Sequence, residues 1–125
     1  MSTISIIGSG GMAAAIGGRI AKGGHIVEGV SRDPANARWL ADRLAAGATA
    51  GAYGAALAGD ILILAVPYGS AAAVVADYGD TLDGKVIIDA TNPVAADLKG
   101  LVTPNGSSGA QEIAKAAPSS AHVVK

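Results

Sequence analysis

Hydrophobic residues recur along the chain in short runs that alternate with stretches of helical spacing. Glycines and prolines separate the apolar runs, which is typical of strands bounded by turns. Met12, Ile16 and Ile20 lie four residues apart, and this spacing predicts a helix directly after the first run. We expect strands at residues 4–7, 25–31, 48–50, 60–66, 85–89 and 122–125. We expect a first helix from residue 12 to the glycines at 23–24, and further helices at residues 34–46, 53–58, 70–78 and 108–116.

The run at residues 60–66 is aliphatic after its first residue, so it predicts a strand that is buried on both faces of a sheet. The composition agrees, because 50% of the residues are hydrophobic, only 3% are aromatic and there is no Phe. We therefore predict an α/β, doubly wound, mostly parallel sheet of about six strands with helices on both faces. Residues 1–125 have the length of one domain, and their end inside a predicted strand leaves open that they are the N-terminal part of a longer protein.

The net charge of −1 and the absence of cysteine narrow the range of functions. A nearly neutral chain offers no strongly basic surface, so neither nucleic acid nor a membrane is expected as a partner. Without cysteine, disulfides, cysteine-ligated zinc and thiol catalysis are excluded, and we predict no metal site. The longest apolar run, residues 61–67, is too short to cross a bilayer, and no basic segment precedes the first strand, so we expect a cytoplasmic location.

Gly8, Gly10 and Ala13 follow the first predicted strand with the spacing of the dinucleotide-binding fingerprint G-x-G-x-x-G/A. In that motif the first glycine makes a tight turn, the second lets the backbone approach a pyrophosphate, and the small third residue lets the helix lie close to the sheet. The N–H groups of the first helical turn then stabilise the phosphates. The alternative is a glycine-rich turn that binds nothing, since such spacings also arise by chance in a chain with 18 glycines.

Ser31 and Arg32 stand at the end of the second predicted strand, about 20 residues beyond the glycine motif. In dinucleotide-binding folds this position meets the adenosine ribose, and an acidic residue there binds the 2′-hydroxyl of NAD. A hydroxyl followed by a guanidinium suits a 2′-phosphate instead, so NADP is favoured over NAD. Glu28 lies on the opposite face of the strand, and Asp33 is placed to cap the next helix. The alternative for Arg32 is a solvated loop side chain.

Two further segments lie at the carboxyl ends of predicted strands, where a nicotinamide would be bound. Val66 and Pro67 close the fourth strand, and the adjoining Tyr68 is either a cofactor contact or an aromatic residue that covers the next helix. Asn92 and its neighbours follow the fifth strand in a rigid Asn-Pro turn. Asp89 is interpreted as a strand-end carboxylate, because no histidine or lysine accompanies it, and no catalytic residue is predicted.

Taken in order, the segments GSGGMAAAIGGRIAKGGH, VSRDP, ILILAVPY, VIIDATNP and HVVK resemble the NADP-binding domain of the coenzyme F420-dependent NADP oxidoreductases over nearly the full chain. The resemblance implies hydride transfer between NADP and a deazaflavin, coenzyme F420, or a flavin. It places the pyrophosphate at the first turn, the 2′-phosphate after the second strand and the nicotinamide at the next two strand ends. With Tyr68 added, the expected cofactor-binding residues are Gly8, Ser9, Gly10, Gly11, Met12, Ser31, Arg32, Val66, Pro67, Tyr68, Thr91, Asn92 and Pro93.

The family continues beyond a VVK-like strand into a region that completes the second-ligand pocket and a dimer. The resemblance therefore leaves a homodimer open, and it leaves open whether 125 residues are active by themselves. Direct hydride transfer needs two rings in position rather than an acid–base pair, which fits the absence of a catalytic motif. The alternatives are a non-catalytic NADP-binding regulatory module and a fragment of an imine reductase similar to pyrroline-carboxylate reductase.

Overall fold

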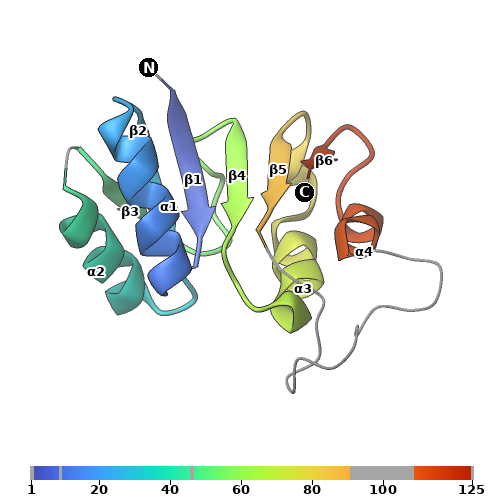
Figure 1. Cartoon of the computed structure of the whole chain (residues 1–125). Helices are drawn as coiled ribbons and strands as arrows, with labels where there is room; N and C mark the ends of the chain where they lie inside the picture. The colour runs from blue at the N-terminus through green and yellow to red at the C-terminus, as the bar shows by residue number, and fades with distance from the viewer. Residues whose placement is uncertain (1, 9, 46, 91–108, 125) are drawn as a thin grey trace.

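The chain forms a parallel sheet with helices on both faces in this computed structural model, which describes residues 2–8, 10–45, 47–90 and 109–124 (Figure 1). Within these residues the sheet has six strands, all parallel, in the order β3-β2-β1-β4-β5-β6. This order is that of the Rossmann fold, so the predicted fold class is confirmed. The strands are β1 (Thr3–Ile7), β2 (Ile26–Val30), β3 (Thr49–Gly51), β4 (Ile61–Leu64), β5 (Val86–Asp89) and β6 (His122–Val124).

Two buried clusters of aliphatic side chains join the sheet to its helices. One contains Ile6 and Leu40 and lies on the side of α1 and α2, whereas the other contains Ile7, Val75 and Ile113 and lies on the side of α3 and α4. Successive residues of β1 thus enter opposite layers, as alternation along a strand requires. The helices are α1 (Gly11–Lys22), α2 (Pro34–Leu44), α3 (Tyr68–Tyr78) and α4 (Gly109–Ala116), with a 3₁₀ turn η1 (Gly79–Leu82) after α3.

The helix predicted from the spacing of Met12, Ile16 and Ile20 is present as α1, but smaller residues form its buried face. Its fully buried residues are Ala13 and Gly17, while Ile16 only packs against the edge of the core and Met12 is 53% exposed. The reason is the close packing of α1 on α2, because a side chain on Gly17 would meet the Leu44 side chain at 2.7 Å. Small residues therefore form the contact, and the larger aliphatic residues flank it.

Helix α2 begins as predicted, since the Asp33 carboxylate accepts a hydrogen bond from the Ala35 N–H at 2.9 Å. Trp39 on α2 does not lie in the core. It is 49% exposed, and the Arg43 guanidinium lies over its ring at 5.4 Å. None of the described helices is long and apolar enough to cross a membrane.

The predicted helix at residues 53–58 is wrong, because this segment forms turns between β3 and β4. It is tied to the sheet by Glu28, whose carboxylate accepts hydrogen bonds from the Ser5 hydroxyl at 2.7 Å and the Ala58 N–H at 3.0 Å. The Gly59 N–H donates in turn to the Ser5 hydroxyl at 3.0 Å. The Ala58 and Gly59 N–H groups thus donate to the buried side chains of Glu28 on β2 and Ser5 on β1, and not to carbonyls within a helix.

Candidate functional site

The turn between β1 and α1 is shaped by close contact with β4. The Gly8 N–H donates to the Val30 carbonyl at 2.9 Å, and Gly8 has a φ of +129°. A side chain on Gly8 would overlap the carbonyl oxygen of Ala65, at the end of β4. The first glycine of the fingerprint is therefore required by the fold itself.

Gly10 has a different role, because no part of the described chain requires a glycine there. It is the N-cap of α1 with a φ of −79°, and a side chain at this position would meet no atom within 4 Å. No side chain caps α1, and its first turn contains no acidic residue. Among the described residues no side chain therefore accepts from the N–H groups at the start of α1, which fits a site for a phosphate group.

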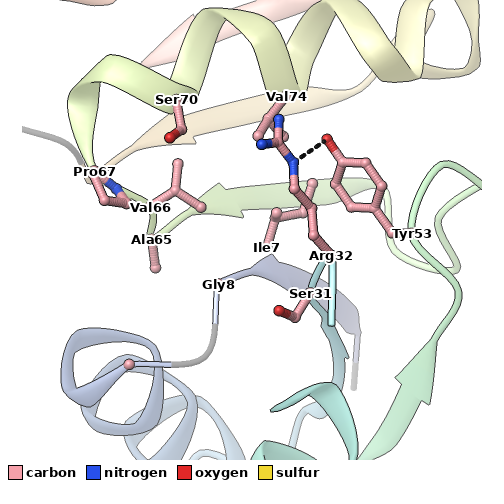
Figure 2. A pocket seen from close by; sticks show the side chains of 11 residues that line it. Ile7, Gly8, Ser31, Arg32, Tyr53, Ala65, Val66, Pro67, Ser70 and Val74 are labelled. Atoms are coloured by element: carbon pink, nitrogen blue, oxygen red, sulfur yellow. Dashed lines mark hydrogen bonds between the residues drawn. The ribbon is translucent and has the colours of Figure 1, made fainter. Parts of the chain in front are cut away.

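A cleft of about 310 Å³ lies where β1, β2 and β4 end (Figure 2). Its volume is at the lower end of the range for small-ligand pockets. The glycine turn forms one part of its wall, the tip of β2 a second, and the segment from β4 into α3 a third. The described lining residues are Ile7, Gly8, Gly10, Ser31, Arg32, Tyr53, Ala65, Val66, Pro67, Ser70 and Val74.

The structure brings six of the predicted cofactor-binding residues together around this cleft: Gly8, Gly10, Ser31, Arg32, Val66 and Pro67. Gly11 and Met12 are exposed in the first turn of α1 and are not among the described lining residues. Tyr68 is the first residue of α3, and its side chain is outside the described part of the chain. Ser9, Thr91, Asn92 and Pro93 also lie outside the described residues. Asp89 ends β5 and is buried.

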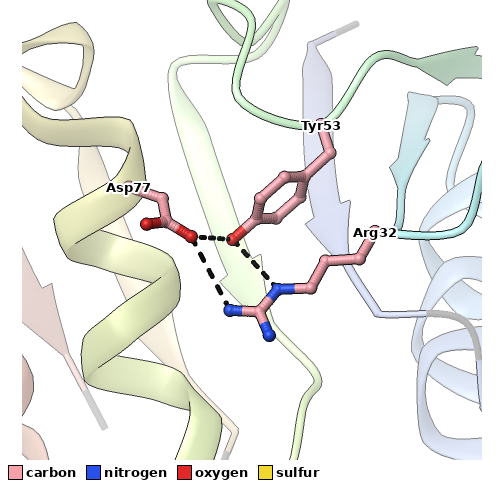
Figure 3. A network of polar contacts seen from close by, with 3 residues as sticks. All are labelled: Arg32, Tyr53 and Asp77. Carbon is pink, nitrogen blue, oxygen red and sulfur yellow. Dashed lines mark hydrogen bonds and ion pairs between the residues drawn. The ribbon is translucent and has the colours of Figure 1, made fainter.

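Arg32 is held by two residues from distant parts of the chain (Figure 3). Its Nε donates to the Tyr53 hydroxyl at 3.4 Å, and its Nη2 forms an ion pair with Asp77 Oδ2 at 3.6 Å. The Tyr53 hydroxyl donates to the same Asp77 oxygen at 2.7 Å. Burial raises the pKa of Tyr53 above its usual value, and the bond to Asp77 adds to this, so the hydroxyl keeps its proton and acts as the donor.

The sequence did not predict Tyr53, Ser70, Val74 or Asp77 at this site. Tyr53 lay in the segment that was interpreted as a helix, and Asp77 lies near the end of α3, far from any strand end. Only the aromatic character of Tyr53 in a chain with 3% aromatic residues offered a signal. Asp77 offered none, because its meeting with Arg32 depends on how α3 lies across the sheet.

The strand order and the glycine turn at the end of β1 define the class of Rossmann-fold proteins. Comparison with protein families narrows this class. Residues 3–93 match the family described as NADP oxidoreductase, coenzyme F420-dependent, and the chain belongs to this family. Among the described residues no group of three or more His, Asp or Glu side chains is placed to hold a metal ion.

Several solved structures share this fold. A hypothetical protein of Sinorhizobium meliloti is 30% identical with a TM-score of 0.78, and the match covers 98% of this chain and 60% of that one. Two further matches are the 3-hydroxyisobutyrate dehydrogenase of Mycobacterium tuberculosis (18% identity, TM-score 0.69) and a reductive aminase of Aspergillus terreus solved with NADPH (24% identity, TM-score 0.67). Each match covers 98% of this chain and 39% of the other protein. None of the curated proteins matches the chain.

Proposed function

We propose that this chain is the cofactor domain of an oxidoreductase that binds NADP(H) in the cleft at the ends of β1, β2 and β4. The observation that carries the proposal is the position of Ser31 and Arg32, which line the same cleft as Gly8 and Gly10. A pyrophosphate-binding turn and a phosphate-binding strand tip are thus combined as an NADP molecule requires. The family supports the choice of NADP.

In this arrangement the uncapped start of α1 binds the pyrophosphate, and the Ser31 hydroxyl and the Arg32 guanidinium bind the 2′-phosphate. Val66 and Pro67 border the nicotinamide from the end of β4. Thr91, Asn92 and Pro93 are proposed for the same role, as the sequence predicted. Backbone amides recognise the part that all dinucleotides share, so the choice between NADP and NAD falls to the side chains at the tip of β2.

The proposed reaction is hydride transfer between the nicotinamide and coenzyme F420 or a flavin-type acceptor. NADPH supplies two electrons as a hydride and becomes NADP⁺. The chain contributes positioning, because among the described residues no His, Lys, Asp or Glu lines the cleft. The apolar side chains of Ile7, Ala65, Val66 and Val74 exclude water beside the bound cofactor.

Calorimetric titration with NADP and NAD tests the cofactor assignment. Arg32→Ala removes charge-assisted hydrogen bonds of about 1.5–3 kcal/mol each, so we expect NADP to bind roughly 10- to 100-fold more weakly, with NAD nearly unchanged. Ser31→Asp introduces a carboxylate that repels the phosphate and accepts a hydrogen bond from the 2′-hydroxyl of NAD, so the preference should reverse.

Arg43→Ala is the matched control, since it removes the same charge from α2, where Arg43 stacks on Trp39 away from the cleft. It should leave both affinities within about twofold. An NADP/NAD ratio that stays the same in Arg32→Ala and Ser31→Asp would show that the adenosine ribose does not lie at the tip of β2.

A further inference from the structure

The Arg32 side chain does not lie beside Ser31, although both residues line the cleft. It extends from the tip of β2 toward α3, and its guanidinium points to Tyr53 and Val74 and away from the Ser31 hydroxyl (Figure 2). The guanidinium is held there by the Tyr53 hydroxyl and by Asp77 on α3 (Figure 3). The arginine thus spans one side of the cleft.

Asp77 and a 2′-phosphate are chemically similar partners for a guanidinium, because both present anionic oxygens. The Arg32 guanidinium is directed away from the Ser31 hydroxyl and toward Asp77, so a phosphate bound at Ser31 would have to share the Arg32 donors with the Asp77 carboxylate. The ion pair at 3.6 Å is open to solvent, with Arg32 57% and Asp77 51% exposed. Ion pairs of this kind are weak and are readily exchanged.

We propose that Asp77 is a specificity-determining residue, which competes with the 2′-phosphate of NADP for Arg32 and so reduces the preference of this site for NADP over NAD. The inference rests on the proposed role of Arg32 in binding the 2′-phosphate. Tyr53 contributes to the competition, since its hydroxyl donates to Asp77 at 2.7 Å and fixes the carboxylate beside the guanidinium. NAD has no phosphate at this position, so its binding does not depend on the exchange.

The test is Asp77→Asn, measured by calorimetric titration with NADP and NAD. The amide keeps the size of the side chain and still accepts the Tyr53 hydrogen bond, but it loses the negative charge. Removing one exposed ion pair and one nearby repulsive charge should tighten NADP binding about three- to tenfold. NAD binding should change by less than about twofold.

Asp80→Asn is the matched control. Asp80 is exposed in η1, just beyond α3, and within the described residues it forms no ion pair with Arg32. The Asp80→Asn substitution removes one negative charge near the same end of α3, so a general electrostatic effect would appear in both variants. We expect less than a twofold change in NADP affinity for Asp80→Asn.

Arg32→Ala separates this inference from the proposed function. Competition is supported if Arg32→Ala weakens NADP binding, Asp77→Asn strengthens it, and the gain in affinity disappears in the double variant. If Asp77→Asn weakens NADP binding or leaves it unchanged while Arg32→Ala still weakens it, Asp77 positions Arg32 or has no effect on it. In that case the competition is refuted, but the proposed 2′-phosphate site is not. If Arg32→Ala leaves NADP affinity unchanged, the 2′-phosphate assignment fails and the inference fails with it.

Discussion

Replacing Gly10 by alanine separates a glycine that the ligand requires from one that the fold requires. A methyl group at Gly10 meets no atom within 4 Å, and the φ of −79° is open to alanine. Alanine is a poorer N-cap than glycine by about 0.5 kcal/mol, but it restricts the unfolded chain, which is worth about 0.4–1 kcal/mol. The two effects offset each other, so we expect the free energy of unfolding to change by less than about 0.5 kcal/mol.

The same methyl group occupies the space through which a pyrophosphate would approach the first turn of α1. Loss of one charge-assisted hydrogen bond costs about 1.5–3 kcal/mol, which corresponds to roughly 10- to 150-fold weaker binding. NADP and NAD should lose affinity equally, because both carry the pyrophosphate. This common loss distinguishes Gly10→Ala from changes at Ser31 and Arg32, which should change the ratio of the NADP and NAD affinities.

Two other glycines give the controls for this experiment. Gly18 lies within α1, and a methyl group there also meets nothing within 4 Å, so Gly18→Ala should raise stability by about 0.5–1 kcal/mol without changing cofactor affinity. Gly8→Ala should fail to fold, because the side chain would overlap the Ala65 carbonyl oxygen. Chemical denaturation and calorimetric titration measure both properties. A stable Gly10→Ala variant that binds both cofactors with unchanged affinity would refute pyrophosphate binding at this turn.

Two further predictions concern the sheet and the reaction. Glu28→Gln should lower the free energy of unfolding by about 1–3 kcal/mol, because the hydrogen bonds from Ser5 and Ala58 lose their charged acceptor. Urea denaturation measures this change. A loss no larger than that caused by Asp42→Asn, at an exposed position, would contradict the prediction. The 125-residue chain should bind NADPH but reduce coenzyme F420 or a flavin far more slowly than an ordinary enzymatic rate of about 10 per second, because it covers only 60% of the length of its Sinorhizobium neighbour. Steady-state turnover at that ordinary rate would show that these residues form the whole active site.

The strands were the most predictable part of the fold. Each predicted strand is present, and β4, whose unbroken aliphatic run predicted burial on both faces, lies between β1 and β5 in the sheet. Such runs are informative because a strand in the middle of a parallel sheet is covered on both faces. The glycine turn and the capped start of α2 were also predictable, since each is marked by a motif of residues close together in the sequence.

The errors arose where packing between elements outweighed local preference. The alanines and glycines at residues 52–59 were compatible with a helix, but the buried Glu28 carboxylate takes the Ala58 N–H and holds the segment in turns. The spacing of Met12, Ile16 and Ile20 predicted the helix α1 correctly, but it does not identify the buried residues, Ala13 and Gly17, which close packing on α2 selects. In both cases the deciding partner lies on another element, which periodicity along one segment does not reveal.

The same distinction explains how cofactor choice is set in this site. In the proposed complex the start of α1 binds the pyrophosphate through backbone amides, and every dinucleotide presents that group, so this part of the site would not discriminate. Discrimination would then depend on the charges near the tip of β2, where Arg32 is proposed to bind a 2′-phosphate and Asp77, paired with Arg32 at 3.6 Å, to compete for the guanidinium. Arg32 follows directly from the sequence motif, but Asp77 reaches it only because α3 packs beside β4. Under the proposed competition, a prediction of NADP preference from the Ser31–Arg32 pair alone overstates that preference, by the factor that Asp77→Asn would recover.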